Sequence, residues 1–119
     1  IPLFNLVFHE CIVIPWDGLH SRGAWSIDPK DPPYVWALLC GGTIYLHQHS
    51  TKEDVEYGKI ALELHKQIAL CELTKHEILD EGGRARRSTF SDGTVVEANL
   101  DSGEFCIRYP DGRVVCGKD

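Results

Sequence analysis

Apolar residues crowd the start of the chain, where eight of the twelve positions in NLVFHECIVIPW, residues 5–16, are apolar. Such a run predicts a buried strand, which we expect over residues 3–14. His9 and Glu10 interrupt the run, and burying a carboxylate without a partner is costly. The strand must therefore reach the surface at this point, or the two residues must have a function there.

A long loop, a short helix and a second strand are predicted next. Residues 15–33 are rich in Pro, Gly and Asp, and a loop of this length inside a compact domain is usually functional or disordered. Residues 34–40, YVWALLC, lie between two prolines and two glycines, which suit the entry and exit of a helix. Residues 43–49, TIYLHQH, are mainly β-branched and aromatic, which predicts a strand.

The longest predicted helix follows this strand. Ser50-Thr-Lys-Glu53 fits a capping box, and we expect the helix to run from about residue 51 to residue 73. Its apolar residues recur at a spacing of three and four, which predicts a broad buried face. The residues of this face are Tyr57, Ala61, Leu64, Ile68 and Cys71, widened by Ile60, Leu62 and Ala69.

The last 39 residues have a different pattern, in which three turn signals end at Gly93, Gly103 and Gly112. Each fits a three-residue hairpin loop with the glycine in the left-handed conformation. The runs between them, RRSTF, TVVEANL, EFCIRY and RVVC, predict a four-strand antiparallel meander. Its register places Cys106 opposite Cys116, where a bond could form under oxidation. Disulfide geometry is demanding, however, and we expect both thiols to be free.

These elements together predict an α+β fold. The order β-α-β-α in the first half implies parallel strands joined by right-handed crossovers. Parallel sheets need several strands and cover on both faces, which this half of the chain lacks. We therefore expect residues 1–80 to be the last β-α-β-α portion of a larger α/β structure, followed by the meander at residues 81–119.

Composition excludes two classes of partner. The chain has 119 residues, the usual size of one domain, with 43% apolar and 25% charged residues, as in soluble globular proteins. Its net charge of −6 argues against nucleic acid, because phosphate contacts need clustered Lys and Arg. No apolar run approaches the roughly 18 residues of a membrane span, so we expect no membrane partner either.

The chain contains no methionine, even at position 1. No signal peptide is visible, so we expect a processed product or a piece of a longer chain. The five cysteines are an odd number without CxxC spacing, which disfavours a disulfide scaffold or a Cys-rich zinc site. We expect no cofactor.

Polar and aromatic residues are predicted to converge on one rim. In βα units, functional side chains gather where strands end and the following loops begin. Trp36, in contrast, lies in the short predicted helix, where we expect it to belong to the core. The residues expected at the rim are His9, Glu10, Trp16, His20, Trp25, His47 and His49.

Three segments resemble parts of TIM-barrel glycoside hydrolases related to endo-α-N-acetylgalactosaminidases. Residues 2–16, PLFNLVFHECIVIPW, resemble their P-L-[YF]-x-L-V-[YF]-H-[DE] segment. The glycine pair after the short helix is similar to the approach to their last barrel strand, so the resemblance implies that residues 1–80 are the terminal β-α-β-α portion of an α/β barrel. The segment from His76 through RSTFSDGTVVEANL resembles the point where those enzymes leave the barrel for a C-terminal β domain. Two positions depart from the pattern: Glu10, where Asp is commoner, and Ala98, where a β-branched residue is preferred.

The resemblance implies a retaining mechanism with two carboxylates roughly 5–5.5 Å apart. We expect that pair on earlier barrel strands, which are absent here, so no catalytic residue is assigned and this chain alone is expected to be inactive. Glu10 is the carboxylate in the most suitable place, and Asp17 is a conceivable second one. The chain is thus predicted to be a fragment that contributes part of a carbohydrate-binding rim. The residues expected to contact the carbohydrate are His9, Glu10, Trp16, Trp25 and His47.

Two other functions remain open. The chain could be a free-standing metal-binding domain that uses His9, Glu10, His47 and His49, because alternate residues of a strand share a face. It could also be an interaction module whose exposed parallel edge pairs with a partner chain. Since two parallel strands cannot cover their own edges, we expect an isolated copy to form a homo-oligomer, most simply a symmetric dimer, or to pair with the missing part of its parent chain.

Overall fold

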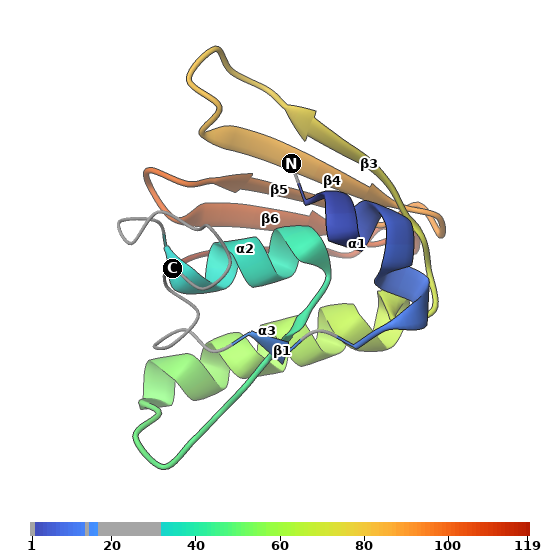
Figure 1. Ribbon diagram of the computed structural model, residues 1–119. Coiled ribbons are helices and arrows are strands. Elements are labelled where there is room, and N and C mark those ends of the chain that lie inside the picture. The colour runs from blue at the N-terminus through green and yellow to red at the C-terminus, as the bar shows by residue number, and fades with distance from the viewer. Residues whose placement is uncertain (1, 14, 17–31) are drawn as a thin grey trace.

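Within residues 2–13, 15–16 and 32–119, which the computed structural model describes, three α-helices and a five-stranded antiparallel sheet share one core (Figure 1). The α+β class is therefore confirmed. None of the described helices is both long and apolar enough to cross a membrane. The helices are α1 (Leu3–Phe8), α2 (Pro33–Cys40) and α3 (Lys52–Ile68), with the 3₁₀-helix η1 (His9–Cys11) after α1.

The five-stranded sheet is a meander in which every strand pairs with its neighbours in sequence. The strands are β3 (Leu73–Ile78), β4 (Ala85–Phe90), β5 (Val95–Asn99), β6 (Glu104–Arg108) and β7 (Val114–Lys118). The four predicted strands correspond to β4–β7. The glycines at the three predicted turns have φ values of 94°, 75° and 90°, which confirms the left-handed conformation.

The additional strand, β3, replaces the predicted end of the long helix. The helix ends at Ile68, not near residue 73, because Leu73 leaves it to pair with Phe90 and is buried against the core. The predicted domain boundary near residue 80 lies between β3 and β4, which pair with each other, and the division into two domains stays a prediction.

Because successive side chains of a strand point to opposite faces of the sheet, alternate residues form an inner face that packs against the helices. Helix α3 contributes the predicted residues Tyr57, Ala61, Leu64 and Ile68, all buried. Its stripe is narrower than predicted, since Leu62 is 51% exposed. The sheet contributes the buried residues Phe90, Val96, Ala98, Phe105 and Ile107.

Helix α3 begins one residue later than the sequence predicted. Thr51, not Ser50, is the N-cap: its Oγ1 accepts a hydrogen bond from the Asp54 N–H at 3.2 Å. The Asp54 carboxylate in turn accepts from the Thr51 N–H at 2.6 Å. This reciprocal pair forms a capping box in which Asp54 takes the place expected for Glu53.

The predicted first strand is wrong, because residues 3–8 form helix α1. The strand would have needed a parallel neighbour to satisfy its backbone groups, whereas a helix satisfies them internally. Polar side chains of α1 and of the following η1 point inward: Asn5 is 7% and His9 is 3% exposed. Leu3, Phe4, Val7 and Phe8 are left 43–69% exposed on its other side.

The parallel pair of strands exists but is much shorter than predicted. Strand β1 (Pro15–Trp16) pairs in parallel with β2 (Thr43–Ile44), with Trp16 opposite Ile44. The predicted strand over residues 43–49 is therefore confirmed only at its start. Beyond Ile44 the chain turns toward the N-terminus of α3, as the hydrogen bond from the Ser50 N–H to the His47 carbonyl oxygen at 2.9 Å shows.

Trp36 packs against the core, as predicted, and anchors a polar cluster between α2 and the sheet. The Arg86 guanidinium lies 4.9 Å from the centre of its ring, and the His76 ring stacks near it at 6.4 Å. Arg86 donates to His76 Nε2 at 3.4 Å, so the proton of the neutral ring is on Nδ1 and is donated to Ser88 Oγ at 2.9 Å. Burial, followed by the Arg86 charge, lowers the pKa of His76 to about 4.

Candidate functional site

The carboxyl ends of β1 and β2 point to the same edge, because the two strands are parallel and paired in register. Ligands of open α/β structures bind at this edge, outside the ends of parallel strands. Residues 17–31 follow β1 in the sequence, and residues 45–50 follow β2. We call the described part, Trp16 and residues 45–50, the rim. Asp17, His20 and Trp25 lie outside the described residues, as does the side chain of Trp16.

His47 is the best-defined side chain of the rim. Its backbone N–H donates to Ser50 Oγ at 2.9 Å, and its Nδ1 accepts from the His49 N–H at 3.1 Å. Because Nδ1 accepts, the proton of the neutral ring is on Nε2. The His47 ring meets the His49 ring edge-on at 5.9 Å. The turn thus fixes the orientation of the half-buried His47, while Gln48 and His49 are exposed.

A carboxylate that the sequence analysis missed lies beside this turn. Asp54 accepts a hydrogen bond of 2.5 Å from the Tyr34 hydroxyl group on α2. This bond, followed by the bond from the Thr51 backbone and with a smaller contribution from His47, lowers the pKa of Asp54 below its ordinary value. The only signal in the sequence was the alternative capping box that begins at Thr51. Asp54 therefore connects α2, the start of α3 and the rim as a fixed anion.

An apolar groove of about 220 Å³ continues from the rim between β2 and α3. Its walls include Leu46, Val55 and Leu62, whose side chains are 42%, 40% and 51% exposed. Leu46 lies against Gly58, where an added Cβ would approach its methyl group to 3.6 Å. The rim is thus polar at the strand end and apolar along the helix, a combination suited to an amphipathic ligand.

His9 and Glu10 are not at the end of a strand, where the sequence placed them, but in η1. The buried His9 ring contacts two backbone carbonyl oxygens: Cys71 O is 2.7 Å from Nδ1, and Gly41 O is 3.0 Å from Nε2. Glu10 is partly exposed, and its Oε1 accepts from the thiol of Cys11 at 3.8 Å. Their role in binding carbohydrate stays a prediction, and Glu10 has the more accessible side chain.

The proposed metal site is not formed. Among the described residues, which include His9, Glu10, His47 and His49, no group of three or more His, Cys, Asp or Glu could hold a metal ion. The physical reason is that β2 ends at Ile44. His47 and His49 therefore lie in a turn and do not alternate along one face of a strand. Both ring nitrogens of His9 already contact backbone carbonyl oxygens.

Solved structures similar to this chain include those of the α-N-acetylgalactosaminidase NagBb from Bifidobacterium bifidum. A quadruple mutant has 27% identity and a TM-score of 0.71, covering 100% of this chain and 17% of that chain. The complex with GalNAc has 26% identity and a TM-score of 0.71, covering 98% and 18%. The complex with Gal-NHAc-DNJ has 25% identity and a TM-score of 0.69, covering 98% and 19%.

No family model matches the chain, and a search of curated proteins gives no match. The structural similarity extends over the whole of this chain, while the chain spans between 17% and 19% of the length of NagBb. The chain therefore has the fold of one part of an α-N-acetylgalactosaminidase, and it resembles a fragment of a glycoside hydrolase.

Proposed function

We propose that the chain is a part of a glycoside hydrolase and supplies a portion of its substrate-binding rim, without the catalytic carboxylate pair. The observation that carries this proposal is the match along 98% of the chain to NagBb in complex with GalNAc, at a TM-score of 0.71. On this proposal, α2, β2 and α3 are the last elements of an α/β barrel, and the sheet β3–β7 begins the domain that follows the barrel.

The position of the rim supports this role. Active sites of barrel enzymes lie at the carboxyl ends of the strands, and the rim is formed by the chain leaving β1 and β2. In this proposal, His47 donates from Nε2 to a sugar hydroxyl, Trp16 and Trp25 stack on sugar rings, and Glu10 accepts from hydroxyl groups. The buried His9 contributes indirectly in this proposal, by holding the backbone at Gly41, just before β2.

The amount of uncovered apolar surface supports a fragment. Six large apolar residues between positions 3 and 13 are 43–69% exposed, and they lie next to one another along the chain. Burying such surface stabilises a protein by roughly 25 cal/mol per Å², so a larger chain or a second copy gains stability by covering it. The residues are Leu3, Phe4, Val7, Phe8, Ile12 and Val13.

A titration with N-acetylgalactosamine, followed by NMR of the labelled chain, tests the rim. We expect the signals of His47, Gln48 and His49 to move, and His47→Ala to reduce this response severalfold. Lys75→Ala, on an exposed position of β3, serves as the matched control. Rim signals that stay unchanged at saturating sugar would refute the proposed binding role.

The chain alone is expected to lack glycosidase activity, because retaining hydrolysis needs two carboxylates that flank the bond. An assay on aryl α-N-acetylgalactosaminides checks this expectation. Turnover above background that disappears in Glu10→Gln would show that the chain carries a catalytic group of its own, contrary to the proposal.

A further inference from the structure

Two rows of side chains cross all five strands on the outer face of the sheet, away from the core. The strand register places Glu77, Arg87, Glu97, Cys106 and Cys116 in the first row. The same register places Leu79, Ala85, Asn99, Glu104 and Lys118 in the second row. Positions two residues apart on a strand share a face and lie about 7 Å apart.

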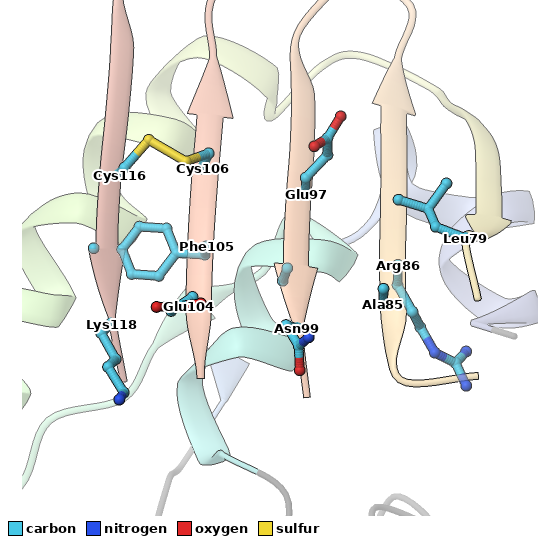
Figure 2. A pocket seen from close by; sticks show the side chains of 12 residues that line it. Leu79, Ala85, Arg86, Glu97, Asn99, Glu104, Phe105, Cys106, Cys116 and Lys118 are labelled. Atoms are coloured by element: carbon cyan, nitrogen blue, oxygen red, sulfur yellow. A yellow bond between two sulfur atoms is a disulfide. The ribbon is translucent and has the colours of Figure 1, made fainter. Parts of the chain in front are cut away.

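A shallow depression of about 660 Å³ lies between the rows (Figure 2). Its apolar part comes from Leu79, Ala85 and the disulfide between Cys106 and Cys116. The short side chain of Ala85 and the compact disulfide leave the space open, while the longer side chains of Glu97, Glu104 and Lys118 stand around it. The depression is therefore an apolar floor within a polar margin.

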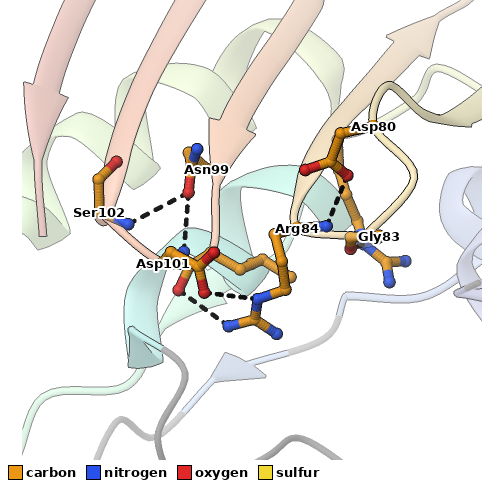
Figure 3. A network of polar contacts seen from close by, with 8 residues as sticks. Asp80, Gly83, Arg84, Asn99, Asp101 and Ser102 are labelled. Carbon is orange, nitrogen blue, oxygen red and sulfur yellow. Dashed lines mark hydrogen bonds and ion pairs between the residues drawn. The ribbon is translucent and has the colours of Figure 1, made fainter.

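The side chain of Asn99 is fixed at this margin. Its Oδ1 accepts from the backbone N–H of Asp101 at 2.8 Å and of Ser102 at 3.1 Å (Figure 3). The amide nitrogen, Nδ2, makes no hydrogen bond with any described residue and keeps two N–H groups for a ligand. Because the turn holds Oδ1, these donors are oriented before a ligand binds, which lowers the entropic cost of binding.

Two carboxylates likewise have one oxygen that is hydrogen-bonded within the protein and one that is left for a ligand. Glu97 accepts from Arg87 at 2.8 Å and from Arg108 at 2.9 Å, both through Oε1. Glu104 accepts from Ser102 Oγ at 3.1 Å through Oε2. The second oxygen of each carboxylate has no hydrogen-bond partner among the described residues, so each can accept one hydrogen bond from a ligand.

The charges on the outer face around the depression balance. Glu77, Glu97 and Glu104 are negative, and Arg87, Arg108 and Lys118 are positive, so an anion or a metal ion gains no net attraction. Donors from Asn99 and Lys118 stand beside acceptors from the two glutamates, around an apolar floor. This is the pattern that complements a sugar ring, which has alternating hydroxyl groups around a face of C–H bonds.

We propose that this outer depression binds a neutral saccharide, as a second site separate from the rim. The inference rests on the lining of the depression and does not depend on the proposed hydrolase function. The ligand is small and the site is open, so the affinity is expected to be millimolar. In a parent enzyme, such a site would hold a glycan at a distance from the reacting bond.

Filling the depression tests the proposal without removing a polar group. Ala85→Leu places a larger side chain on the floor, and Thr89→Leu, four residues further on the same face of β4, is the matched control outside the lining. Galactose and N-acetylgalactosamine are titrated to about 50 mM, well above a millimolar dissociation constant. The readouts are the Asn99 side-chain amide signals and the backbone signals of Ala85 and Lys118.

We expect sugar-dependent shifts of these signals in the natural chain and in Thr89→Leu, and at least a tenfold weaker response in Ala85→Leu. Glu104→Gln should weaken binding about threefold, the value of a modest hydrogen bond. The proposal is overturned if neither sugar moves these signals, if Ala85→Leu responds fully, or if inorganic phosphate produces the same shifts. Shifts confined to residues 45–50 would refute this site while leaving the rim intact.

Discussion

Asn5 on α1 and His9, the first residue of η1, both contact carbonyl oxygens at the end of α2. Asn5 Nδ2 donates to Cys40 O at 3.1 Å, and His9 Nε2 lies 3.0 Å from Gly41 O. The last carbonyl groups of a helix have no partner within the helix, and side chains of α1 and η1 contact them here. A short helix with an exposed apolar side is thus held in place by hydrogen bonds.

Replacing either residue should destabilise the protein, because buried carbonyl groups would lose the polar side chains that contact them. We expect His9→Ala to lower the free energy of unfolding by about 2–3 kcal/mol and Asn5→Ala by about 1 kcal/mol. Urea unfolding followed by circular dichroism measures both. His49→Ala, at an exposed position, should change stability by less than about 0.5 kcal/mol. Equal effects of His9→Ala and His49→Ala would contradict this account of α1.

The free energy of unfolding should depend on pH through the titration of His76. Its pKa is about 4 in the folded protein, lowered by burial and by Arg86 from an ordinary value of 6.5. Between these values the unfolded chain binds a proton that the folded chain rejects, so stability falls as the pH drops from 6.5 toward 4. The full contribution, present above pH 6.5, is on the order of 3 kcal/mol.

Urea unfolding at several pH values between 4 and 7.5 measures this slope. Carboxylates also titrate in this range, so the comparison is between the natural chain and His76→Gln. We expect the variant to have the shallower slope. Identical slopes in the two proteins would show that His76 is not the source of the pH dependence.

The expectation of five free thiols is wrong, because Cys106 and Cys116 form a disulfide across β6 and β7. The predicted register is confirmed, and the Cα atoms of the two residues are 4.1 Å apart. The disulfide closes a separation of ten residues, for which the chain-entropy model gives about 3 kcal/mol of stabilisation. Thiol titration of the unreduced, denatured chain should find three free thiols: Cys11, Cys40 and Cys71.

Reduction is therefore expected to loosen the edge strand β7 first. Hydrogen exchange of the β7 amides should accelerate after reduction, while the β4–β5 amides change little. Five titratable thiols in a protein purified without reductant would contradict the disulfide. Cys106→Ser with Cys116→Ser serves as the permanently reduced form.

The exposed side of α1 should cause self-association, and a symmetric dimer is the simplest closed form. Phe4→Glu and Val7→Glu place charges among the exposed apolar residues and should shift light scattering toward the mass of one chain. Leu70→Glu, at a residue that is 89% exposed outside α1, is the control. A single-chain mass for the natural protein over a wide concentration range would disprove the dimer.

The sequence predicted the elements whose partners are close along the chain. The hairpins were predicted from turn glycines, and α3 from its cap and its 3–4 spacing, because these signals are local. Helix α1 and strand β3 were missed because tertiary contacts decide them. Leu73 leaves the helix to meet Phe90, and residues 3–8 form a helix because no long strand pairs with them.

The candidate site was also predicted only in part: features that follow from chain order were found, and features set by tertiary contacts were missed. Convergence at the carboxyl ends of parallel strands followed from chain order, and β1 and β2 confirm that these ends share an edge. The position of His9 could not be predicted, since its partners at Cys71 and Gly41 are far away in sequence. Asp54 was missed because its partner Tyr34 lies on a different helix.

The meander connectivity of the sheet also bears on how the chain folds. Each strand of β3–β7 pairs with a strand adjacent in sequence, so the sheet can grow by closing short hairpins one after another. In contrast, α1 and η1 are held by partners 35 and 62 residues away, and closing such loops costs more entropy. The second half of the chain should therefore form the folding nucleus, and α1 should dock last. Although α1 precedes α2 and the sheet in the sequence, it should dock only after they have formed.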